Sequence, residues 1–173
     1  MKHNQKYIIP FKGLKDGKHI FTYNLDRGFF DLFEADEINR VDLNAEIQCN
    51  KKDNFIELQF SINGFIETIC DLCLDYYPQK IKSTGNLYIR FGEESIELSD
   101  ELIVIPFNQT EFEISQYLFD LSMLGIPFKR QHDPDTNGHG CDPEMIKILR
   151  NLETKKELNQ SDLRWNILKK IKY

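Results

Sequence analysis

Hydrophobic and polar residues alternate along much of the first hundred positions, and this pattern predicts a β-rich N-terminal part. The clearest alternation spans residues 41–49, where apolar side chains occupy the odd positions and polar side chains the even ones. A period of two places one face of a strand in a core and the other in water. The polar segment 50–54 then predicts a turn, and alternation resumes over residues 56–62.

Asn63-Gly64 follows this second strand, and the dipeptide has two interpretations. It is either a tight hairpin turn or a bulge inside a longer strand. We expect the bulge, because a turn would leave residues 65–70 as a very short strand. Further strands are expected over the following ranges: 5–11, 19–25, 79–91 and 101–107. Pro10 restricts the first of these to a sheet edge, and residues 25–35 are consistent with a short helix.

The hydrophobic period changes after residue 108, and this change predicts helices. Apolar residues at 114, 117, 118, 121 and 124 form one stripe of an amphipathic helix that ends before Pro127. A polar loop covers residues 128–142, and Asp142-Pro143 has the residue types of a helix start. Ser161 is a candidate cap for a last short helix.

Together these patterns predict an α+β protein: an antiparallel β meander or partly closed barrel, followed by two or three C-terminal helices. We expect residues 1–153 to form a single α+β domain that contains a Cys-x-x-Cys hairpin. Residues 154–173 are expected to form a basic C-terminal tail with a short helix.

Composition fits this picture of a globular protein. The chain has 173 residues, of which 40% are hydrophobic and 29% charged, and a chain of this length can bury a core without disulfides. Its longest apolar runs are far shorter than the roughly 18 residues that span a bilayer. The N-terminal residues lack the apolar core of a secretion signal. We therefore expect a cytoplasmic protein, whose cysteines are thiols or metal ligands.

Charge is distributed unevenly along the chain. The net charge is −6, yet residues 147–173 contain eight basic and three acidic residues, a net charge of +5. The remainder therefore carries −11. Residues 93–120 contain eight acidic side chains and no Lys or Arg. A basic end on an acidic body indicates a polyanion contact, although lysines in a last helical turn also favour the helix dipole and solubility.

The segment ETICDLCLDYYP, residues 67–78, places Cys70 and Cys73 between two expected strands. Three interpretations of this pair remain open. A redox pair usually opens a helix after a strand, which this setting does not offer. A packing pair is a second interpretation, because free cysteine is often buried. Zinc is the third, and it needs about four nitrogen or sulfur ligands.

The polar loop offers partners for a zinc site. It contains His132, His139 and Cys141, and a set of Cys70, Cys73, His132 and Cys141 would tie this loop to the hairpin tip. His139 lies between two glycines and is the weaker candidate. Cys49 falls on the apolar side of its strand and is a poor ligand. No nucleophile elbow and no phosphate-binding loop occurs in the sequence, and we expect no catalytic residues.

The order of these features resembles the YceD family, the large ribosomal RNA subunit accumulation proteins. The resemblance covers roughly residues 40–173 and depends on Cys70, Cys73 and Leu74, the stretch from Leu121 to Pro127, and then His132 and Cys141. The C-terminal segment 162–168, DLRWNIL, adds to it. The interval between His132 and Cys141 is longer than is usual for the family, which leaves open which histidine faces the cysteines.

The resemblance implies a non-enzymatic role in bacteria, in the accumulation or processing of large-subunit rRNA. The implied partner is that rRNA or a ribosomal protein, without a membrane or a small-molecule substrate, and a structural zinc ion is the implied cofactor. Basic residues supply sequence-independent affinity for RNA, and a tryptophan can stack on a base. The RNA-binding candidates are in the tail: Lys155, Lys156, Arg164, Trp165, Lys169, Lys170 and Lys172.

Two other functions compete with this one. One is a thiol-disulfide oxidoreductase that uses Cys70 and Cys73. The other is a protein-interaction module whose acidic belt, residues 93–120, docks basic partners electrostatically.

Overall fold

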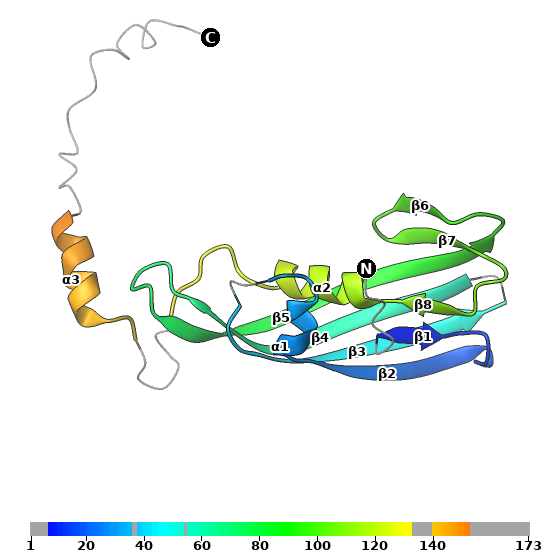
Figure 1. Cartoon of the computed structure of the whole chain (residues 1–173), viewed down its shortest axis with the longest axis horizontal. Coiled ribbons are helices and arrows are strands. Elements are labelled where there is room, and N and C mark those ends of the chain that lie inside the picture. The colour runs from blue at the N-terminus through cyan, green and yellow to red at the C-terminus, as the bar shows by residue number, and fades with distance from the viewer. Residues whose placement is uncertain (1–6, 36–37, 54, 133–139, 153–173) are drawn as a thin grey trace, which may run out of the picture.

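A long, curved β-sheet forms the body of the protein, short strands and two helices cover one of its faces, and a third helix lies beyond one end of the sheet (Figure 1). The computed structural model describes residues 7–35, 38–53, 55–132 and 140–152. The six strands of this sheet are β2 (Gly17–Leu25), β3 (Val41–Lys52), β4 (Phe55–Ile69), β5 (Tyr76–Gly92), β6 (Ile96–Ser99) and β7 (Leu102–Pro106). A separate two-stranded sheet pairs β1 (Ile8–Pro10) with β8 (Glu111–Glu113).

Three helices accompany the strands in the described residues: α1 (Arg27–Asp31), α2 (Ser115–Leu124) and α3 (Pro143–Leu152). The α+β class and the C-terminal position of α2 and α3 are confirmed. The last helix expected from Ser161, and the boundary placed at residue 153, lie outside the described residues. No helix among the described residues has both the length and the apolar character needed to cross a membrane.

The strand order is β2-β3-β4-β5-β7-β6, and the sheet is mostly antiparallel, as predicted, with one parallel pair. Strand β7 pairs with β5 in parallel, so the sheet is not a simple antiparallel meander. The reason is the short strand β6, which the hydrophobic pattern does not predict and which reverses the chain before β7. The alternative of a partly closed barrel is wrong, because β2 and β6 are the two edges of an open sheet.

The predicted alternation explains where the core lies. On β3, Leu43, Ala45, Ile47 and Cys49 are all fully buried. They face a layer made of the β1–β8 pair, α1 and α2, which supplies Ile9, Phe29, Phe30 and Leu118 to the same cluster. The opposite face of the sheet is polar and open among the described residues, as the period of two requires.

Asn63-Gly64 is part of one uninterrupted 15-residue strand, so the long-strand interpretation is confirmed. The bulge itself is wrong, because the register with β3 runs through Asn44↔Asn63 and Leu43↔Gly64 without a shift. Gly64 has φ +145°, and a Cβ there would lie 2.1 Å from the Asp42 carbonyl oxygen. The glycine is needed because the β3 backbone approaches closely.

Candidate metal centre

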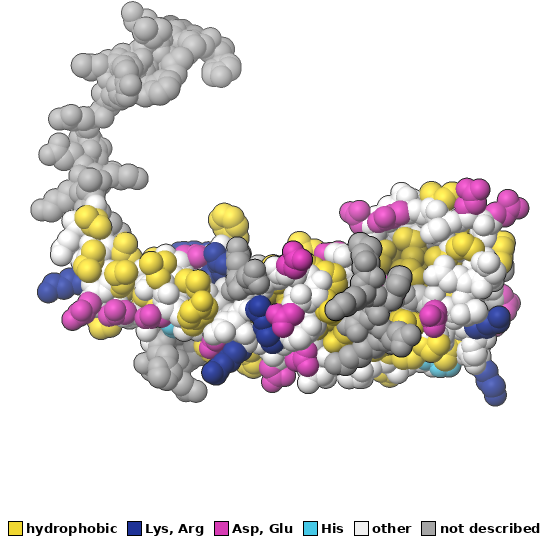
Figure 2. Space-filling model, in the orientation of Figure 1, with side chains coloured by type: hydrophobic (Ala, Val, Ile, Leu, Met, Phe, Trp, Pro, Cys, Tyr) yellow, Lys and Arg dark blue, Asp and Glu magenta, His cyan; other side chains and the backbone are white. Residues whose placement is uncertain are grey.

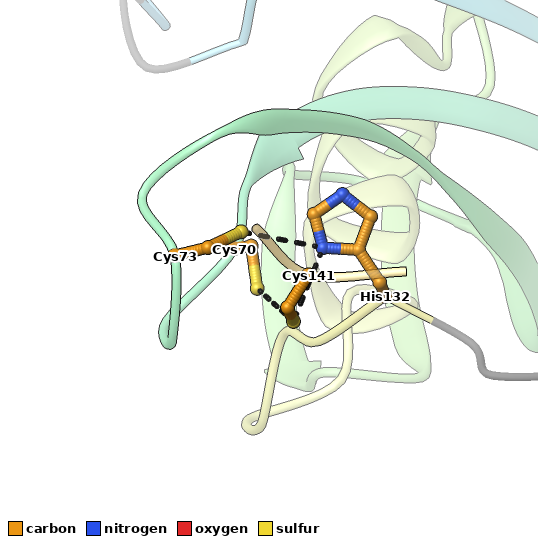
Figure 3. A group of neighbouring side chains, drawn as sticks. All are labelled: Cys70, Cys73, His132 and Cys141. Atoms are coloured by element: carbon orange, nitrogen blue, oxygen red, sulfur yellow. Dashed lines mark hydrogen bonds between the residues drawn. The ribbon is translucent and has the colours of Figure 1, made fainter. Parts of the chain in front are cut away.

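The hairpin tip between β4 and β5 holds Cys70 and Cys73 in a tight turn. The backbone N–H of Cys70 donates to the Asp75 carbonyl at 2.9 Å, and the N–H of Leu74 donates to the Cys70 carbonyl at 3.0 Å. Leu74 adopts φ +63°, in the left-handed region. This backbone aims both sulfurs towards one side of the tip, where Cys70 is 0% and Cys73 5% exposed (Figure 3).

A second segment, which follows α2, is fastened to this tip through Asp71 and Arg130. The N–H of Asp71 donates to the Arg130 carbonyl at 2.8 Å, and the N–H of Arg130 donates to Asp71 Oδ2 at 2.7 Å. The Arg130 guanidinium also pairs with Asp71 Oδ1 at 3.3 Å. His132 lies two residues after Arg130, so this clamp positions its ring beside the cysteines. No sequence pattern predicts that these two residues, 59 positions apart, pair with each other.

Cys141 reaches the same point from the start of α3. Asp142 caps that helix, since the N–H of Glu144 donates to Asp142 Oδ1 at 2.8 Å, and the Asp-Pro helix start is confirmed. Met145, on the first turn of α3, packs with Cys141 against the cluster formed by Cys70, Cys73 and Tyr77. The helix is therefore joined to the hairpin tip at its N-terminal end.

The four predicted ligands come together. One ligand atom from each of Cys70, Cys73, His132 and Cys141 lies within 4.8 Å of the other three. Cys70 Sγ is 3.7 Å from Cys141 Sγ. His132 Nδ1 is 3.5 Å from Cys73 Sγ and 3.5 Å from Cys141 Sγ (Figure 3). His139, the other histidine considered, lies outside the described residues.

These separations fit a zinc ion. Zinc bound tetrahedrally at ordinary Zn–S and Zn–N lengths needs sulfurs about 3.8 Å apart and a nitrogen about 3.6 Å from each sulfur. Three sulfurs and one imidazole are also a usual ligand set for structural zinc. The Tyr77 ring lies 4.8 Å from the His132 ring, centroid to centroid, and covers the cluster with an aromatic side chain.

The thiols differ in their proton affinity. Burial raises the pKa of Cys70, but backbone hydrogen bonds from Cys73 and Leu72 and further bonds from His132 outweigh it and lower the pKa to about 6. Burial raises the pKa of Cys141 to about 11, together with its hydrogen bonds to Cys70 and Cys73 and their negative charge. Three thiolates cannot all be charged at this distance unless a cation compensates them.

The other predicted site residues cannot be placed. The RNA-binding candidates lie outside the described residues: Lys155, Lys156, Arg164, Trp165, Lys169, Lys170 and Lys172. Cys49 is buried in the main core and takes no part in the cluster, as expected.

Fold and site together define an open-sheet α+β protein with a Cys3His cluster at one end of the sheet. The sequence pattern of one family, described as "Large ribosomal RNA subunit accumulation protein YceD", matches residues 58–172, most of the chain and all four cluster residues. The chain belongs to this family, which confirms the resemblance. No curated protein and no solved structure matches the chain.

Proposed function

We propose that the chain is a non-enzymatic ribosome-biogenesis factor that supports accumulation of large-subunit rRNA. The observation that carries this proposal is the family match over residues 58–172, because the family is named for that role. The factor acts by binding, to rRNA or to a ribosomal protein. The basic tail, residues 154–173, supplies the RNA contact, since Lys and Arg neutralise phosphates regardless of sequence.

A zinc ion held by Cys70, Cys73, His132 and Cys141 belongs to this proposal. When bound, zinc supplies charge compensation and a cross-link rather than a reaction, because all four ligands come from the protein. The cross-link joins the hairpin tip, the segment after α2 and the start of α3. The ligands are supported by their mutual distances. The metal thus orients α3, from which the basic tail continues.

The decisive experiment is a ribosome profile of cells that lack the gene, complemented by variants. We expect the deletion strain to have a reduced large-subunit peak and less large-subunit rRNA. The wild-type gene should restore both. A gene in which Lys169, Lys170 and Lys172 are changed to Gln should restore them only in part. A normal large-subunit peak in the deletion strain would contradict the proposal.

Binding of the purified protein to large-subunit rRNA gives a direct test of the tail. The logarithm of the affinity should fall with the logarithm of the salt concentration, by roughly 0.7–0.9 for each phosphate contact. The triple Lys→Gln variant should reduce this slope by about 2–3. An unchanged slope would place the RNA contact elsewhere.

A thiol-disulfide oxidoreductase is the second candidate, and the lowered pKa of Cys70 favours it. The setting opposes it, because both thiols of the pair are nearly inaccessible and they lie in a β-hairpin rather than at a helix start. The two functions differ in one result. Cys73→His abolishes a redox function, because the thiol pair is lost, but it leaves a Cys2His2 ligand set that zinc also accepts, and so it retains the binding function.

A further inference from the structure

Strand β6 is an unusually exposed edge of the sheet. All four of its residues are exposed, including Ile96 at 48% and Leu98 at 57%. It pairs only with β7 among the described strands, so its outer side presents unpaired backbone groups. Phe107, 72% exposed, lies near the start of the β5–β6 connection, because its N–H donates to the Gly92 carbonyl. Exposed apolar side chains on an open edge mark a surface that another strand can cover.

The segment of the chain that contains this edge strand is acidic. Residues 93–120 carry no Lys or Arg, and their acidic side chains are all exposed: Glu93, Glu94, Glu97, Asp100, Glu101, Glu111, Glu113 and Asp120. Some of these charges converge in space. The pKa of Tyr117 is raised by burial and then by the negative charges of Glu97 in β6, Asp120 in α2 and Asp100 in the β6–β7 turn. Figure 2 shows acidic side chains around the β6–β7 hairpin, with hydrophobic ones between them.

The opposite edge of the sheet, at strand β2, carries exposed lysines. Strand β2 is preceded by Lys15 and contains Lys18, both exposed, and it also has an exposed apolar side chain, Ile20, at 66%. Lysines on an edge strand discourage pairing with other chains. Both edges therefore expose apolar side chains, but of the two described edge strands only β2 contains a lysine.

We propose that the β6 edge binds an extended, Lys- and Arg-rich segment of a protein, which adds to the sheet as a further strand. Backbone hydrogen bonds would supply affinity, and the partner's alternating side chains would contact Ile96, Leu98 and the acidic residues. This inference rests on the proposed function, because proteins of an assembling ribosomal subunit supply basic segments of this kind. RNA is excluded from this edge by the same negative charge.

The test uses two fluorescein-labelled peptides and the full-length, zinc-loaded protein. The peptide KVKVKVKVK has the charge and the alternation of a strand, and KGKGKGKGK has the same charge without strand propensity. Fluorescence anisotropy gives both dissociation constants. We expect the first peptide to bind about tenfold more tightly than the second, and both affinities to fall between about 50 and 300 mM salt.

Matched variants locate the contact. Leu98→Lys should weaken the binding of the first peptide by about tenfold or more. Ile20→Lys, the matching substitution on the other edge strand, should leave the affinity for this peptide unchanged. Equal binding of the two peptides, or equal effects of the two substitutions, would overturn strand addition at β6. Tighter peptide binding in the Lys169/Lys170/Lys172→Gln variant would also overturn the assignment, because the chain's own tail would then be the occupant.

The outcome is separable from that of the proposed function. Suppose that the deletion strain has a normal large-subunit peak but the protein still binds the first peptide through Leu98. This result would refute the ribosomal role and support strand addition at β6. Suppose instead that the deletion strain has a clear rRNA phenotype, that the Leu98→Lys gene fully rescues it, and that the protein does not bind the peptide. This result would refute strand addition at β6 and leave the ribosomal role in place.

Discussion

At the scale of single residues, the four cluster residues and Gly64 owe their roles to segments that are distant from them in the sequence. The cluster of Cys70, Cys73, His132 and Cys141 could be predicted because few cysteines and histidines of the chain lie in polar turns and loops. The role of Gly64 could not, because its cause is the Asp42 carbonyl on a neighbouring strand. A sequence shows that a glycine interrupts a pattern, but it does not show which backbone lies opposite.

Replacing Gly64 by Ala should therefore destabilise the protein by about 2 kcal/mol or more, because the new Cβ meets the β3 backbone at an unfavourable φ. Urea unfolding measures the change in the free energy of unfolding. Gly13→Ala is the control, since nothing lies within 4 Å of a Cβ there, and it should change stability by less than about 0.5 kcal/mol. Equal changes in the free energy of unfolding for the two variants would refute the close approach of the β3 backbone to Gly64.

Zinc affinity should rise with pH through the neutral range. The pKa of Cys141 is raised to about 11 without metal, so at neutral pH its thiol holds a proton that zinc must displace. Chelator competition between about pH 6 and pH 8 measures the trend. Cys141→Ser should lower the zinc affinity by more than about tenfold and weaken its dependence on pH. Cys49→Ala should leave the affinity and its pH dependence unchanged. A pH-independent affinity would contradict the thiol's assignment as a ligand.

At the scale of elements, local pattern predicted most strands and helices but not how they pair. β3, β4 and α2 follow from their periods, because each has one buried face. β6 and β8 were missed because neither has a fully buried residue to establish a period. The parallel pairing of β7 with β5 depends on β6. Because β6 was not predicted, the parallel pairing was not predicted either.

Helix α2 offers a test of the assigned packing. Leu118→Ala should cost about 2–5 kcal/mol, because Leu118 is fully buried against the sheet and the change leaves a cavity. Leu124→Ala, in the same helix but 80% exposed, should cost less than about 0.5 kcal/mol. Thermal or urea unfolding measures both losses of stability. A larger loss for Leu124→Ala than for Leu118→Ala would contradict the orientation of the helix.

At the scale of the whole molecule, the buried apolar residues of the described part of the chain form two separate clusters. The larger lies between the sheet and its covering layer, and the smaller surrounds Cys70, Cys73 and Tyr77. Composition indicated a globular protein but could not show this division, because it arises from contacts between Cys70 and Cys141, 71 positions apart. It also could not exclude a barrel, since closure depends on whether the outer strands meet.

Metal removal should therefore loosen one end of the protein and spare the other. With chelator, amide hydrogen exchange should accelerate in α3 and in residues 70–75, because the cross-link between them is lost. Exchange in the paired stretch of β3 and β4 should stay slow, since its core contains no ligand. Acceleration throughout the sheet would show that the metal supports the entire fold.

The length of the β4–β5 hairpin has a consequence for how the molecule can be used. β5 alone has 17 residues, which at ordinary strand rise extends on the order of 50 Å. Its two ends therefore lie too far apart for one small ligand to touch both. The hairpin therefore separates the β6 edge from the metal centre, so a partner bound at one of these two places leaves the other accessible.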